Sequence, residues 1–211
     1  MTEEVKNQLN ELSKISNQIT NLVNNGKPFG NTEKQTLFLA YFDIDVEHLH
    51  SLHLLISNDN IGSASALVRT FYETFFRALW VNAFATIEQL ENIRNSKFKF
   101  NNMGSKIKQL DSHYTGTKFF ENLKDGVWGI MSDYTHSGSY QLSRRWTDGE
   151  LVPNYKENEI LEIIIEVTKT YLLFANMLFK IHNYQDEENK VLEILLEYKK
   201  NTNTILEVMY K

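Results

Sequence analysis

The chain contains no cysteine and only two prolines among its 211 residues. Without cysteine it can form no disulfide, no thiolate zinc site and no cysteine nucleophile. With two prolines and nine glycines, little in the sequence interrupts a helix, so long helices are expected. An excess of positive charge is also missing. The formal net charge of −5 argues against a protein that coats nucleic acid through bulk electrostatics.

Long apolar runs and common catalytic motifs are absent as well. No stretch approaches the roughly 18 uncharged apolar residues that a membrane-spanning helix needs, so no membrane segment is predicted. The chain begins Met-Thr-Glu-Glu-Val-Lys-Asn-Gln, which is polar and partly acidic, unlike a signal peptide. There is no Walker loop, no Gly-x-Gly-x-x-Gly turn, no His-Glu-x-x-His motif and no Gly-x-Ser-x-Gly elbow. We therefore expect a cytoplasmic protein outside those enzyme classes.

Apolar residues recur at spacings of three and four along most of the chain, which predicts amphipathic helices. Hydrophobic residues make up 42% of the chain and aromatic residues 12%, which is typical of a globular protein. The length is that of one domain. The prediction is a single all-α domain over residues 1–211, composed of N-terminal helices (1–57), a motif-bearing core (60–183) and a C-terminal helix (187–210).

Local signals predict where several helices begin and end. The first helix is expected to stop before Pro28, and the second to run from Thr32 to Ser57 and to form an antiparallel hairpin with the third. Thr86 with Gln89 predicts a capping box for a short helix that ends near residue 94.

A second set of signals concerns the later part of the chain. Gly138 suits the left-handed position that ends a helix over 117–136. Residues 140–155 are expected to form an irregular loop or a small hairpin that turns at Asp148-Gly149. Asn154, with Glu157 three residues later, predicts the cap of the next helix.

Three charged residues interrupt the apolar helix over 64–81. Arg69, Glu73 and Arg77 are four residues apart and therefore follow one helical stripe. The rest of this helix is apolar nearly all round, which predicts that it is buried. Because Glu73 can pair with either arginine, we expect at least one guanidinium to need another acid, a backbone carbonyl or a ligand.

A second cluster of polar residues follows at 132–146. Asp133 and His136 are three residues apart at a predicted helix end, so the carboxylate can interact with the imidazole. A histidine in that place can act as an acid or a base near neutral pH. Arg144 and Arg145 follow in a predicted loop, where planar guanidinium groups suit contacts with phosphate. Together they would suffice for metal-independent RNA cleavage.

Structural interpretations account for the same residues. His136 can be a helix cap paired with Asp133. Arg144 and Arg145 can be solvated loop residues, and the stripe on the apolar helix can be an ion-pair ladder that fixes helix register. His48, His50 and His53 do not share one helical face, so no metal site is predicted there. The basic and aromatic run Lys97-Phe98-Lys99-Phe100 is a weaker candidate for binding single-stranded nucleic acid.

The order of these motifs resembles a group of prokaryotic helical proteins that is similar to a branch of the HEPN superfamily (higher eukaryotes and prokaryotes nucleotide-binding). The resemblance covers roughly residues 60 to 180. It is carried by Arg69, Glu73, Arg77 and Trp80 in an Arg-x-x-x-Glu-x-x-x-Arg-x-x-Trp helix, by the Tyr134–Gly138 segment, by Gln141, by Arg145 and by the Pro153–Tyr155 turn.

The resemblance implies a helical bundle, often dimeric, in a superfamily with many metal-independent ribonucleases of toxin–antitoxin or anti-phage systems. The ribonuclease members carry an arginine four to six residues before a histidine. Here no arginine precedes a histidine at that spacing; Asp133 stands before His136, while Arg144 and Arg145 follow it.

We therefore expect one pocket that binds RNA or a nucleotide without metal or cofactor. In this hypothesis His136 is the general acid or base, Asp133 orients it, and Arg144 or Arg145 holds phosphate. The remaining pocket residues are expected to be the cations Arg69 and Arg77, their orienter Glu73, and the substrate-binding residues Gln141, Asn154 and Tyr155. A homodimer and an antitoxin or other protein partner are further expectations. The alternatives are a non-catalytic module that binds a nucleotide or a protein with the same pocket, and a purely structural role.

Overall fold

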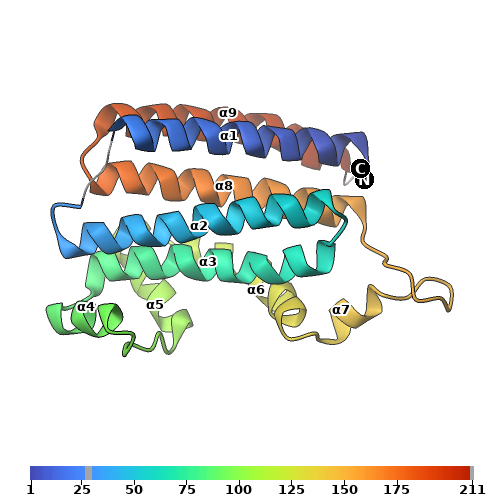
Figure 1. The fold of residues 1–211 in the computed structure, drawn as a ribbon, viewed down its shortest axis with the longest axis horizontal. Coiled ribbons are helices and arrows are strands. Elements are labelled where there is room, and N and C mark those ends of the chain that lie inside the picture. Colours follow the sequence, from blue (N-terminus) through green and yellow to red (C-terminus); the bar gives the residue numbers. More distant parts are fainter. Residues whose placement is uncertain (27–29, 210–211) are drawn as a thin grey trace.

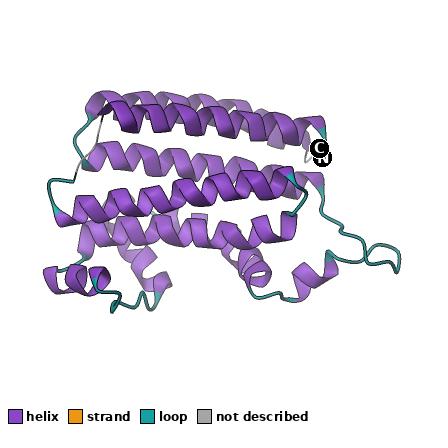
Figure 2. Ribbon diagram, viewed as in Figure 1, coloured by secondary structure: helices purple, strands orange, loops and turns teal. Residues whose placement is uncertain are grey.

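The computed structural model describes the backbone of residues 1–26 and 30–209, and the side chains of these residues except 127, 204 and 206–209. The predicted stop at Pro28 and the predicted helix end at residue 210 lie outside this part. Within it the secondary structure is helical and contains no β-strand, which confirms the all-α prediction (Figure 2). None of these helices combines the length and the apolar character needed to cross a membrane.

Long helices lie side by side and form the body of the protein (Figure 1). They are α1 (Glu3–Gly26), α2 (Glu33–Ser57), α3 (Ile61–Phe84), α8 (Glu157–Ile181) and α9 (Gln185–Met209). Shorter helices cover the outer side of α3: α4 (Ile87–Arg94), α5 (Met103–Leu110), the π-helical turn η1 (Asp111–Thr115), α6 (Phe119–Thr135) and α7 (Ser139–Ser143). The helix α3 therefore lies between the long helices and the short ones.

Two capping boxes begin helices where the sequence predicted them. The Thr32 side chain accepts a hydrogen bond from the Gln35 amide at the start of α2, and Thr86 accepts one from Gln89 at the start of α4. Each glutamine side chain in turn accepts a hydrogen bond from the backbone amide of its threonine. Two amides without a helical partner are therefore satisfied at each helix start. The Gln35 side chain also donates to the carbonyl of Ile181, which ties the start of α2 to the end of α8.

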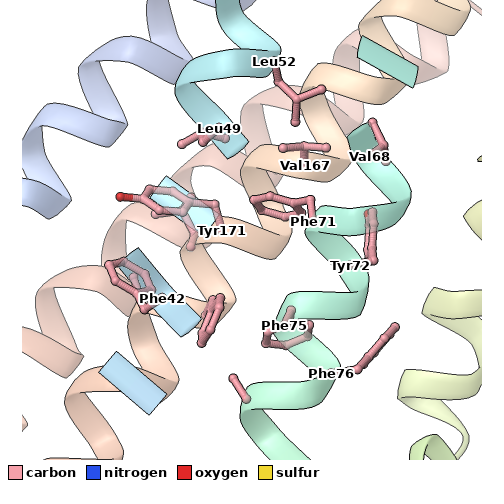
Figure 3. Packing of buried hydrophobic residues seen from close by; sticks show 14 of the residues in the cluster. Phe42, Leu49, Leu52, Val68, Phe71, Tyr72, Phe75, Phe76, Val167 and Tyr171 are labelled. Carbon is pink, nitrogen blue, oxygen red and sulfur yellow. The ribbon is translucent and has the colours of Figure 1, made fainter. Parts of the chain in front are cut away.

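The core is densest around α3, whose apolar side chains are buried on nearly every side. On one side they pack against α2 and α8 (Figure 3). The Phe174 ring of α8 lies 5.2 Å from the rings of both Phe42 and Phe75. On the other side Phe76 lies 6.2 Å from Phe120 of α6. Each buried aromatic ring contributes about 2–3 kcal/mol, so burial on both sides holds α6 against α3.

A buried carboxylate fixes the beginning of α6. Asp111 accepts hydrogen bonds from the backbone amides of Phe120, at 2.7 Å, and Glu121, at 3.0 Å. These amides have no partner within the helix, so the carboxylate satisfies them. Its negative charge is in turn stabilised by the positive end of the helix dipole. Asp111 thereby joins the start of α6 to η1.

The end of α6 differs from the prediction. Ser137, and not Gly138, takes the left-handed conformation, with φ of 53°. Gly138 is needed for another reason: a Cβ there would lie 2.0 Å from a carboxylate oxygen of Asp133. The carboxylate occupies this space because it accepts a hydrogen bond from the Gln141 amide in the first turn of α7. The prediction that Gly138 takes the left-handed conformation was therefore wrong.

The region 140–155 is only partly the predicted loop. Its first residues form α7, which the sequence did not indicate. The predicted turn is present: Asp148 and Gly149 have positive φ, and Thr147 pairs with Glu150 across them. The predicted cap at Asn154 is wrong, since α8 begins at residue 157 with Lys156 in the cap position.

The fully buried Asp45 of α2 makes the stability of the fold depend on pH. Burial raises the pKa of this carboxyl well above its ordinary value, and a contact with the Thr74 side chain opposes the shift in part. Its Oδ1 lies 3.3 Å from His48 Nδ1, and its Oδ2 has no hydrogen-bond partner among the described residues. Burial also lowers the pKa of His48.

Replacing Asp45 by asparagine should therefore stabilise the protein at neutral pH. The unfolded chain releases the Asp45 proton near pH 4, whereas the folded protein retains it to a higher pH. The wild type thus loses stability over that window, and Asp45→Asn does not. Urea unfolding should give similar free energies for both proteins at pH 3 and a difference that grows towards pH 7. Asp43→Asn, at an exposed position of the same helix, is the control. A less stable Asp45→Asn protein at pH 7 would contradict this account.

Candidate functional site

Glu73 pairs with both arginines of α3 at once. Arg69 Nε donates to Glu73 Oε1 over 3.0 Å, and Arg77 Nη2 donates to Oε2 over 2.6 Å. At least one guanidinium was expected to need another acid, a backbone carbonyl or a ligand. No second acid is needed, because a carboxylate has two oxygens and can accept from both sides. The side chains of Arg69, Glu73 and Arg77 are 22%, 20% and 35% exposed, so the stripe is partly buried and not part of the core.

Aromatic rings flank both ends of this ladder. The Arg69 guanidinium lies 5.1 Å from the centre of the Trp128 ring, and that of Arg77 lies 5.2 Å from the Phe100 ring. A cation over an aromatic face is favourable by about 0.5–2 kcal/mol. Phe100 also packs edge-on against Phe98, which in turn stacks on Trp80. The rings of the 97–100 run are therefore engaged by the protein itself and are not free to stack on bases.

Arg69 also connects α3 to α6. Its Nη1 donates to the Ser132 hydroxyl over 2.6 Å and lies 3.4 Å from His136 Nε2. Trp128, Ser132 and His136 are four residues apart, so they share the face of α6 that meets Arg69. Of the predicted site residues, the structure brings together Arg69, Glu73, Arg77 and His136. Sequence reasoning missed Ser132 and Trp128, although their spacing to His136 was a usable signal.

The His136 imidazole is exposed, and its role in this contact is that of an acceptor. A guanidinium only donates, so a hydrogen bond between these two atoms requires an Nε2 that carries no proton. Arg69 is not saturated by its neighbours. Its Nε and Nη1 are engaged, while Nη2 makes no hydrogen bond within the described part of the chain. A free guanidinium nitrogen and an exposed imidazole therefore lie next to each other.

Asp133 does not orient His136 as predicted. Its Oδ2 accepts from the Gln141 amide over 2.9 Å, and no hydrogen bond joins it to His136 among the described residues. The start of α7 competes for this carboxylate, because its unpaired amides favour a negative group. Asp133 is therefore a capping residue that fixes the turn after α6.

Arg144 is also committed inside the protein. It forms a salt bridge with Glu159 of α8, donates to the Tyr140 hydroxyl over 2.6 Å and lies over the Tyr140 ring. The Tyr140 hydrogen bond and Glu159 raise the pKa of this guanidinium. Its side chain is only 14% exposed. Arg144 therefore serves the packing of α7 on α8 and is not placed to hold a phosphate.

The other predicted residues gather around Gly62 at the start of α3. A Cβ on Gly62 would lie 2.6 Å from the Tyr155 hydroxyl, 3.1 Å from Arg145 Nη2 and 3.2 Å from Gln141 Nε2. The Tyr155 hydroxyl and Gln141 Oε1 are buried without a hydrogen-bond partner among the described residues. Asn154 is exposed, and its backbone amide donates to the carbonyl of Arg144.

The predicted single pocket is thus divided into two groups along α3. One contains Arg69 and His136, and the other contains Gln141, Arg145 and Tyr155. Gly62 precedes Arg69 by seven residues, which corresponds to roughly 10 Å along a helix. The first group has the chemistry for contact with an anion, because its cations are partly exposed and one guanidinium nitrogen is free.

Replacing Glu73 by alanine should destabilise the protein more than replacing Arg77. Glu73→Ala leaves two partly buried guanidiniums without their acid, and we expect the free energy of unfolding to fall by about 2–4 kcal/mol. Arg77→Ala leaves Glu73 paired with Arg69 and should cost about 1–2 kcal/mol. Urea unfolding measures both. In the exposed pair of Glu11 with Lys14, Glu11→Ala is the control, expected within about 0.5 kcal/mol of wild type. Equal losses for Glu73→Ala and Arg77→Ala would show that Glu73 does not hold both arginines.

Comparison with known proteins gives a family and no further relatives. The chain matches no curated protein and no solved structure. Residues 42–204 match the model of a family described as "Family of unknown function (DUF6988)". This match covers α3, α6 and the turn after α6, and so includes Arg69 and His136. Because it spans most of the sequence, the chain belongs to the DUF6988 family.

Proposed function

We propose that the face formed by Arg69, Ser132 and His136 binds the phosphate of RNA or of a nucleotide. The observation that carries this proposal is the 3.4 Å approach of Arg69 Nη1 to the exposed His136 Nε2, with Arg69 Nη2 free beside it. The free Nη2 is a charged donor in a partly exposed position beside a hydroxyl and an imidazole, so this arrangement favours an anion. A phosphate oxygen would accept from Nη2, and the Ser132 hydroxyl could donate to a second oxygen.

The residues around this face already fix the Arg69 side chain in the position in which it would bind an anion. Glu73 and the Trp128 ring hold the Arg69 guanidinium on both sides, so little side-chain freedom is lost when a ligand binds. The Ser132 hydroxyl can both donate and accept. Because the overall charge is negative, recognition would depend on this local geometry and not on a broad basic surface.

We also propose a fold superfamily and a biological system for the protein. The motif order and the all-helical bundle support a variant of the HEPN fold that acts in the cytoplasm, as a homodimer, in a prokaryotic defence or toxin–antitoxin system with a protein partner. Binding without catalysis is the form that the site supports best. The reason is that Asp133 and Arg144, expected to assist chemistry, are held by the Gln141 amide and by Glu159.

Metal-independent RNA cleavage is the second candidate. It is favoured by the exposed His136 Nε2 beside a guanidinium, which is the pairing of a base with a cation that activates a 2′-hydroxyl and stabilises the charge that develops. Here His136 would take the proton of the 2′-hydroxyl as that oxygen bonds to the adjacent phosphorus, and Arg69 would contact the phosphate. The bond from phosphorus to the 5′-oxygen of the next nucleotide would break, and that oxygen would take up a proton from water.

The binding proposal predicts that Arg69→Ala weakens the binding of a fluorescein-labelled single-stranded RNA at least tenfold, as measured by fluorescence anisotropy. A hydrogen bond to a charged group contributes about 1.5–3 kcal/mol, which sets this size. The substitution leaves Glu73 paired with Arg77, so the fold should persist. Arg94→Ala, which removes an exposed arginine paired with Glu33, should change the affinity less than twofold. No binding of RNA or AMP by the wild type at millimolar concentration would refute the proposal.

The cleavage candidate is tested by incubating wild type and His136→Ala with mixed cellular RNA in EDTA. The two proteins must first show equal circular dichroism spectra and thermal unfolding. Cleavage by the wild type alone would establish a metal-independent ribonuclease that uses His136. Binding without cleavage by either protein would leave the non-catalytic form as the function of this face.

A further inference from the structure

A pocket of about 360 Å³ lies on the other side of α6, between α6, α3 and α8. On α6 it is lined by residues such as Ile130 and Tyr134, whereas Ser132 and His136 belong to the opposite face. This volume falls within the range of roughly 300–1,000 Å³ that is typical of small-molecule sites. The pocket is distinct from the Arg69 face, because none of Arg69, Ser132 and His136 lines it.

Carboxylates of α8 form one wall of this pocket. Glu159, Glu162 and Glu166 line it, and their spacing places them on one face of the helix. Glu159 is paired with Arg144, and Glu166 lies 2.9 Å from Lys169. Glu162 has no ion pair or hydrogen bond among the described residues. Glu162 is therefore the carboxylate of this wall whose charge has no partner among the described residues.

The environment of Glu162 opposes its ionised form. Partial burial raises the pKa of this carboxyl, and the nearby charges of Glu159 and Glu166 raise it further. A carboxylate that faces an apolar pocket without a partner is costly, and a cation placed beside it removes that cost. The pocket thus has a position at which a positive charge would be stabilised.

Tyrosine rings also line the pocket. Tyr134 lies edge-on to Tyr140, with ring centres 5.7 Å apart, and 6.4 Å from Tyr155. Burial raises the pKa of Tyr134 to about 12, so the ring is a neutral phenol whose electron-rich face attracts cations. The same behaviour is already visible within the protein, where Arg144 lies over Tyr140.

A buried tyrosine of α3 also lines the pocket. Tyr72 lines the pocket and is fully buried, and its hydroxyl has no hydrogen-bond partner among the described residues. Burial raises the pKa of this phenol, and the Thr170 side chain beside the hydroxyl opposes the shift in part. Tyr72 therefore adds a neutral aromatic ring to the lining, while its hydroxyl lies beside Thr170 of α8.

We propose that this pocket binds a small organic cation of the quaternary ammonium class, with Glu162 as its counter-charge and Tyr134 against its methyl groups. A neutral apolar ligand would leave Glu162 unpaired, and an anion would be repelled by it. A cation that also carries methyl groups satisfies both the carboxylate and the aromatic rings.

Isothermal titration with choline and with 3,3-dimethylbutan-1-ol tests the proposal, because the two molecules have the same shape and differ in charge. The wild type should bind choline at least tenfold more tightly than the neutral alcohol. Glu162→Gln, which removes the charge and keeps the size, should weaken choline binding at least tenfold. Glu193→Gln, at an exposed position of α9, should leave it within twofold.

The proposal would be overturned by no choline binding at 10 mM, by equal affinity for the alcohol, or by equal choline affinity in wild type and Glu162→Gln. Equal circular dichroism spectra of the three proteins, and thermal unfolding of both variants at or above the temperature of the wild type, ensure that a loss of binding is local. Butylamine in the same titration decides whether the site prefers a quaternary or a primary ammonium, and stronger binding of butylamine would overturn the quaternary assignment. RNA binding at Arg69 is measured separately, so either proposal can fail without the other.

Discussion

The shared pairing of Glu73 with Arg69 and Arg77 is the interaction on which the outer half of this protein depends. The helix α3 is apolar nearly all round and must be covered on both sides, yet it carries three charges. Two unpaired guanidiniums would oppose that burial by several kcal/mol. Because one carboxylate accepts from both, and because Trp128 and Phe100 cover the guanidiniums, α6 and the segment before α5 can close over this side of α3.

Because α6 packs over α3, the two faces of α6 have different surroundings. Two carboxylates set its position: Asp111 holds its first amides, and Asp133 near its end holds the start of α7. With both ends held, the faces of α6 have fixed surroundings. One face brings Ser132 and His136 to Arg69, and the other lines the pocket that contains Glu162. Both candidate sites therefore depend on the same pair of caps.

The sequence predicted most of what local forces determine. Helical periodicity and the capping boxes at Thr32 and Thr86 depend on residues within one or two turns of each other, and the structure confirms them. The Arg69 helix and the His136 segment were also expected to meet, and they do. The failures concern partners chosen in three dimensions: Asp133 caps α7 instead of contacting His136, and Arg144 pairs with Glu159 of a distant helix. The pocket was not predicted at all, because its lining comes from α3, α6 and α8, and no single stretch of sequence contains the pattern.

Which charges are free for a ligand follows from which charges the fold already uses. Asp133, Arg144 and Glu159 each have an internal partner, and recruiting any of them for a ligand would first require breaking that contact. Arg69 keeps one unpaired nitrogen, and Glu162 has no partner among the described residues. The charge of Arg69 is paired with Glu73, whereas the partly buried charge of Glu162 has no such partner in the described part of the chain and costs stability. The free Arg69 nitrogen and the Glu162 carboxylate are therefore the groups on the two faces of α6 that a ligand could contact without breaking a contact of the fold, and they suit ligands of opposite charge.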